Sequence, residues 1–142
     1  MTTLQYGPPI SLAVAKQVVA AAEVEALQNG WAMVIAVADS TGHLVVLHKM
    51  DHAQFGSIAI AQSKAFTAVN FKRSSKIFED AVAAGGLGVR LLSAPGLCAL
   101  EGGLPLLSDG RIIGAIGVSG AQSTEDGQVA AAGARVLDTL QA

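Results

Sequence analysis

The sequence contains one cysteine, few aromatic residues and little charge. A lone cysteine, Cys98, excludes an internal disulfide and a zinc-finger type of metal site, so we assign no metal ligands. Charged residues make up 14% of the chain and aromatic residues 4%, whereas roughly 25% charged residues is usual. The apolar content of 51% comes mainly from small and aliphatic side chains. Such a composition favours a protein that covers part of its surface with copies of itself.

Three other features are also missing. The net charge of −2 and the pI of about 5.8 lack the basic excess that nucleic-acid binding requires. No apolar run approaches the ~20 residues of a membrane span. Residues 1–9 lack a basic stretch followed by an apolar core, so we expect no signal peptide and a cytoplasmic protein.

The hydrophobic pattern predicts one domain over residues 1–142, with helices covering a sheet. Residues 33–38 and 43–50 flank an Asp-Ser-Thr-Gly turn, and such a hairpin favours an antiparallel sheet of the α/β (α+β) class. The remaining expected elements are helices over 12–28, 57–71, 74–82 and 123–140, a glycine-rich loop over 83–96, broken strands over 97–107 and a strand over 111–118.

Lys64 and Thr67 lie three positions apart in a predicted helix and therefore share a helical face. If this face lines a pocket, Lys64 can anchor a carboxylate, polarise a carbonyl or act as a base, because a buried amine has a lowered pKa. The alternative is that Lys64 lies at a helix edge or in a subunit contact.

His48 and His52 are candidate ligands for a metal or a haem iron, since imidazole nitrogens bind both. Asp51 lies between them, and the loop position of His52 gives it freedom to reach a ligand. The alternative is that both histidines are structural or solvent-facing.

Glu101 precedes the Gly102-Gly103 pair, where a carboxylate beside an unobstructed backbone can serve as a general acid or base. It can equally pair with Arg90 or Arg111. Ser119 precedes the last predicted helix, whose N-terminus can hold an anion.

A series of short motifs follows a fixed order through nearly the whole chain. They are residues 37–44 (VADSTGHL), 49–51 (KMD), 63–68 (SKAFTA), 102–106 (GGLPL) and 109–120 (DGRIIGAIGVSG), with Asp126 and Ala130 at the start of the last helix. Each motif is weak alone, but together they resemble the GlcG/HbpS family of small bacterial domains.

This resemblance implies a profilin-like fold, an antiparallel sheet flanked by helices. It also implies dimers that assemble further, to a tetramer or an octamer, and binding of haem or another tetrapyrrole. Two features of haem- and iron-binding members have no counterpart. Residues 11–30 contain no axial histidine, and Glu79 and Asp80 are adjacent, whereas the family motif is Glu-x-x-Glu.

The leading hypothesis is therefore a homo-oligomeric protein that binds a small ligand, with haem as the first one to test. Its ligand site is expected between the loop over 51–57, the Lys64 and Thr67 face, and the glycine-rich strands with Gly102, Gly103 and Ser119. The alternative is a cofactor-free enzyme of a catabolic pathway, an isomerase, lyase or hydrolase that uses Lys64, His52 and Glu101 as acid–base groups. A third reading is an assembly partner without a pocket.

Overall fold

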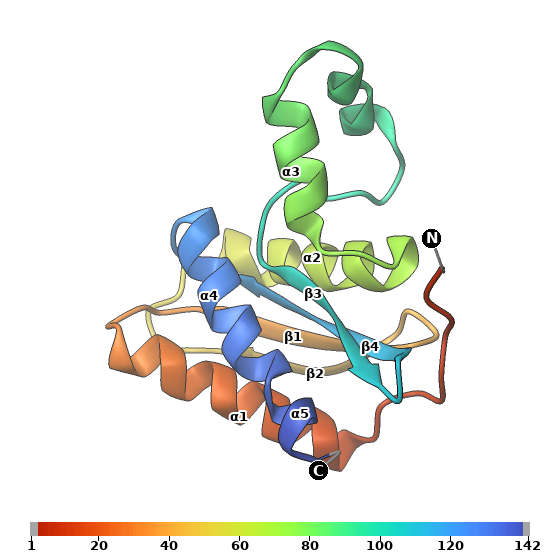
Figure 1. Cartoon of the computed structure of the whole chain (residues 1–142). Coiled ribbons are helices and arrows are strands. Elements are labelled where there is room, and N and C mark those ends of the chain that lie inside the picture. Colours follow the sequence, from red (N-terminus) through yellow and green to blue (C-terminus); the bar gives the residue numbers. More distant parts are fainter. Residues whose placement is uncertain (1–2, 141–142) are drawn as a thin grey trace.

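A four-stranded sheet forms the centre of the protein, and every neighbouring pair of its strands is antiparallel (Figure 1). The computed structural model describes residues 3–140. The strands β1 (Val34–Asp39), β2 (Leu44–Lys49), β3 (Gly103–Ser108) and β4 (Arg111–Ser119) are arranged in the order β2-β1-β4-β3. The expected antiparallel α/β architecture is confirmed.

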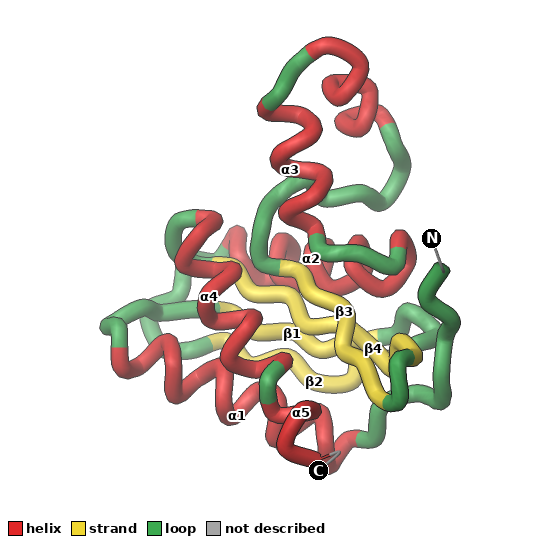
Figure 2. Tube along the Cα trace, in the orientation of Figure 1, coloured by secondary structure: helices red, strands yellow, loops and turns green. Residues whose placement is uncertain are grey.

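Helices cover both faces of this sheet (Figure 2). On one face lie α1 (Leu12–Gln28), α4 (Ser123–Ala134) and α5 (Val136–Leu140), and on the other lies α2 (Gly56–Phe71). Ile35 and Val37 of β1 belong to the hydrophobic core on the side of α1 and α4. Val34 and Ala36 belong to a second core on the side of α2. Two buried faces explain why β1 is apolar from Val34 to Ala38. Within residues 3–140, no helix is both long and apolar enough to cross a membrane.

The hairpin between β1 and β2 is closed by Asp39. Its Oδ1 accepts hydrogen bonds from the Thr41 backbone N–H at 2.9 Å, the Thr41 hydroxyl at 2.6 Å and the His43 backbone N–H at 3.2 Å. Partial burial alone would raise the pKa of Asp39, but these hydrogen bonds outweigh burial and lower it. The Asp-Ser-Thr-Gly turn therefore holds the hairpin that the sequence predicted.

The chain from Ser75 to Ser93 forms an arm that projects from the rest of the protein (Figure 1). It consists of α3 (Ser75–Ala83), which the Ser74 side chain caps, and the 3₁₀ helix η1 (Gly86–Ser93). The expectation of a loop over 83–96 was wrong in this part. The four glycines of the segment suggested irregular backbone, but the stretch from Leu87 to Ser93 supports a short helix.

The expected broken strands over 97–107 are replaced by the single strand β3, which begins at Gly103. Pro105 lies inside β3 because β3 is an edge strand, and its missing N–H disrupts no ladder there. The expected last helix, over 123–140, divides at Arg135 into α4 and α5. Its capping box is formed by Gln122 and Glu125.

Candidate functional site

Lys64 of α2 is buried between the sheet and α4, with a side-chain exposure of 2%. Its Nζ donates hydrogen bonds to the Val118 carbonyl oxygen at 2.8 Å and to Asp126 Oδ2 at 2.9 Å. Asp126, from the first turn of α4, is as buried as Lys64, with 4% of its side chain exposed. The lysine therefore forms an interior ion pair that joins α2, β4 and α4.

Asp126 is a residue that we did not predict as part of a site. Its Oδ1 accepts a hydrogen bond from the Ala121 backbone N–H at 3.0 Å. Burial raises the pKa of this carboxyl group, and the ammonium group of Lys64 opposes that rise. The sequence offered only a weak indication, an acidic residue on the same helical face as Val129 and Ala130, which are buried.

The two glycines that precede and begin β3 allow close packing over Lys64. A Cβ on Gly102, whose φ is +132°, would lie 2.5 Å from the Val118 carbonyl oxygen and 3.0 Å from Lys64 Nζ. A Cβ on Gly103 would overlap with the Lys64 carbonyl oxygen. Gly102 and Gly103 are thus required by contacts within the protein.

Thr67 and Ser119 are also bound to other protein groups. The Thr67 hydroxyl donates to the Ser63 carbonyl oxygen at 2.7 Å and accepts from the Cys98 backbone N–H at 2.8 Å. Ser119 is buried, and its hydroxyl lies 3.1 Å from that of Ser57. The Cys98–Thr67 hydrogen bond attaches the loop at Cys98 to α2. The Ser119–Ser57 contact attaches the end of β4 to the start of α2.

Glu101 lies against α4, where its carboxylate occupies the space that a Cβ on Gly127 would need. Burial raises its pKa, the positive charge of Lys76 lowers it, and the negative charges of Glu79 and Asp80 raise it further. Within the described residues, no ion pair joins Glu101 to Arg90 or Arg111.

A groove of about 660 Å³ lies at the end of β2, beside the C-terminal end of α1. We call it the His52 groove. One part of its wall is apolar and another is charged or polar. The apolar side chains include Leu27, Trp31 and Met50, and the polar ones are Glu23, Lys49, Asp51 and His52.

The two candidate histidines differ in their partners. His48 lies on β2, and its Nδ1 is hydrogen-bonded to Glu23 Oε1. His52 lies in the turn after β2 with a φ of +70°, a conformation that histidine adopts more readily than most residues. Within the part of the chain described, no hydrogen bond or ion pair engages the His52 imidazole. His52 therefore presents an unengaged imidazole to the groove.

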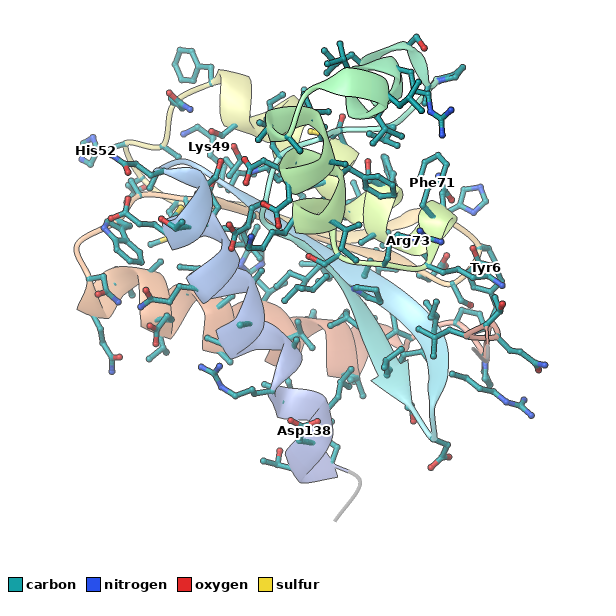
Figure 3. All side chains as sticks on the ribbon, turned by 45° about the horizontal axis from the view of Figure 1, so that its top comes forward. Tyr6, Lys49, His52, Phe71, Arg73 and Asp138 are labelled. Carbon is teal, nitrogen blue, oxygen red and sulfur yellow. The ribbon has the colours of Figure 1, made fainter. Side chains whose placement is uncertain are left out.

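A second groove of about 410 Å³ adjoins the first and shares Lys49 and His52 with it. We call it the Phe55 groove, because Phe55 lines it with 82% of its surface exposed. Lys49 Nζ lies 5.8 Å from the centroid of the Phe55 ring. Figure 3 shows Lys49 and His52 at the same end of the molecule, away from Tyr6.

The predicted site residues thus fall into two groups. Lys64, Thr67, Gly102, Gly103 and Ser119 are engaged in interior contacts. Asp51 and His52 line the surface groove, and His48 contacts it through Glu23. Of the three acid–base candidates, only His52 lines these two grooves.

Comparison with known proteins shows similarity along most of the chain. A model of the family described as "Haem degrading protein HbpS-like" matches residues 10–135. Protein GlcG of Escherichia coli strain K12 is 44% identical over 110 residues, which cover 78% of this chain and 81% of GlcG. The crystal structure of ORFY from Klebsiella pneumoniae is 31% identical, with a TM-score of 0.85 and 97% of each chain covered. The crystal structure of a PduOC–haem complex is 26% identical, with a TM-score of 0.82 over 92% of this chain and 96% of PduOC.

Proposed function

The chain belongs to the HbpS-like family, and on this premise we propose that it binds haem or another tetrapyrrole in the His52 groove. The observation that carries the proposal is the unengaged imidazole of His52 beside an apolar wall. The haem in the PduOC complex supports the choice of ligand class. Because α1 contains no histidine, a residue of the groove would have to hold the haem iron.

The residues of the groove fit this class of ligand. Its volume of about 660 Å³ lies within the roughly 300–1,000 Å³ of typical ligand sites. Haem would supply an iron that accepts imidazole or thioether ligands. His52 would provide an imidazole and Met50 a thioether, while Leu27 and Trp31 would provide apolar surface for the macrocycle.

Replacing His52 by alanine is expected to abolish the shift of the haem Soret band on binding and to weaken haem binding by at least about tenfold. The reason is loss of the imidazole that ligates the iron. The measurement is a haem titration of the purified protein, followed by visible absorption and compared between wild type and His52→Ala.

Two further histidine variants serve as controls. His43→Ala alters an exposed imidazole in the β1–β2 turn and is expected to leave the titration unchanged. His48→Ala removes the partner of Glu23 and is expected to have a smaller effect than His52→Ala. A wild type without a saturable shift, or a His52→Ala variant that retains it, would contradict the proposal.

We also propose that the chain forms a homo-oligomer through the arm formed by α3 and η1. The arm exposes Leu87 by 79%, Leu92 by 67% and Val89 by 48%. Apolar side chains that gather on a projecting segment are typical of an interface. The chain has few charged residues, so the rest of its surface is poor in charge as well. This supports a second copy of the chain as the partner of the arm.

The double substitution Leu87→Ser/Leu92→Ser is expected to convert the oligomer into species close to the chain mass of 14.3 kDa. Both side chains are exposed, so the fold of the single chain is expected to persist. Size-exclusion chromatography with light scattering measures the mass. Leu140→Ser, which changes an exposed leucine of α5, is the matched control. An unchanged mass in the double variant would refute the arm as the interface.

A further inference from the structure

We infer that Lys49 binds a carboxylate substituent of the ligand in the Phe55 groove, while the planar ring of that ligand lies in the His52 groove. The inference rests on the proposed function, because it takes the His52 groove as the ligand site. It adds the direction of the ligand in the site and two residues that select it, Lys49 and Phe55.

The two grooves form one extended site. Lys49 and His52 line both of them, so a ligand in one groove lies beside side chains of the other. The His52 groove offers the larger space and the apolar wall with Leu27, Trp31 and Met50. An apolar ring system therefore fits the His52 groove, and its substituents extend towards the Phe55 groove.

The carboxylates that line the two grooves all belong to the His52 groove. They are those of Glu23 and Asp51. Lys49 brings an ammonium group to the Phe55 groove, and no carboxylate belongs to the described lining of that groove. An acidic substituent therefore meets less repulsion in the Phe55 groove, where an ammonium–carboxylate hydrogen bond is among the stronger kinds.

Phe55 occupies a position where its own helix does not require an aromatic ring. It is the N-cap residue of α2 and makes no side-chain capping hydrogen bond there, although Ser, Thr, Asp and Asn are preferred at N-caps. Its ring is largely exposed and contacts the Lys49 ammonium group. An exposed ring beside a cation is suited to stack on a planar ligand whose acidic group reaches that cation.

The test uses iron-free protoporphyrin IX and its dimethyl ester, which differ in their free carboxylates and bring no iron for His52. Trp31 is the only tryptophan of the chain and lines the His52 groove, so quenching of its fluorescence reports occupation of that groove. Wild type, Lys49→Gln, Lys49→Arg and Phe55→Ala are titrated with both porphyrins at the same pH and salt concentration.

We expect wild type to bind the free acid more tightly than the ester. Lys49→Gln is expected to weaken binding of the acid roughly tenfold and to change binding of the ester less than about twofold, because only the charged hydrogen bond is lost. Lys49→Arg is expected to retain the preference for the acid. Phe55→Ala is expected to weaken both porphyrins, because both present a planar ring.

Equal losses for acid and ester in Lys49→Gln would overturn the inference, even if haem gives a Soret shift that depends on His52. Absence of saturable quenching by either porphyrin would overturn it too. If the acid preference depends on Lys49 but haem gives no shift that depends on His52, the inference holds and the assignment of His52 as the iron ligand fails.

Discussion

Replacing Lys64 by methionine is expected to lower the free energy of unfolding by about 3–5 kcal/mol, because it leaves Asp126 charged and unpaired in the interior. Methionine has a similar length and fills the same space between α2, β4 and α4. The loss therefore reports the missing ammonium group, with its bonds to Asp126 and to the Val118 carbonyl oxygen. Urea denaturation of wild type and variant measures it.

The matched control is the double variant Lys64→Met/Asp126→Asn. Asparagine is uncharged and keeps an oxygen to accept from the Ala121 N–H, so the double variant is expected to be more stable than Lys64→Met alone. If the loss of unfolding free energy in the double variant equals the sum of the losses in Lys64→Met and in Asp126→Asn, the two side chains are not energetically coupled. A Lys64→Met variant as stable as wild type would contradict the interior placement of Lys64.

Replacing Gly117 by alanine is expected to cost about 3 kcal/mol or more, at or above the upper end of typical overpacking costs. A Cβ at this position of β4 would overlap with the Ala61 carbonyl oxygen and lie 2.5 Å from the Ala65 backbone nitrogen. Both atoms belong to the backbone of α2, so no side-chain rotation relieves the clash. The helix must move away from the sheet, and the packing against β4 is lost.

Gly56→Ala is the control for this substitution, because a Cβ on Gly56 meets nothing within 4 Å. It lies at the start of α2, where alanine is the better helix former, so we expect unchanged or slightly higher stability. Thermal unfolding followed by circular dichroism compares both variants with wild type. Equal midpoints for Gly117→Ala and wild type would contradict the close approach of α2 to β4.

Much of the fold could be predicted because local chemistry and final structure agree. The Ser11 side chain caps α1 at the start of the predicted helix, and Asp39 organises the predicted turn. The hydrophobic pattern of the sequence predicted the hairpin strands β1 and β2 and the helices that cover the sheet. The final helix was predicted less well, since it was expected as one element over 123–140 but divides at Arg135.

The elements that the sequence did not predict depend on their neighbours. Whether Pro105 breaks a strand depends on its place in the sheet, and β3 tolerates it only as an edge. The helix η1 has no buried residue that would give a pattern. Neither property is visible in a local window of sequence.

The candidate site was predicted in its residue types but not in its arrangement. The pairing of Lys64 with Asp126 joins residues 62 positions apart, so only the fold could identify the carboxylate. The groove is likewise built from the end of α1 and the turn after β2, which brings Trp31 and Leu27 to His52. Glu23 is hydrogen-bonded to His48, and among the described residues no carboxylate pairs with His52.

The most direct test of the account is a crystal structure of the protein with bound haem. We predict the iron to be ligated by a nitrogen of His52, with the macrocycle against Trp31 in the His52 groove. Haem bound elsewhere, or iron ligated by a residue outside this groove, would contradict the central claim.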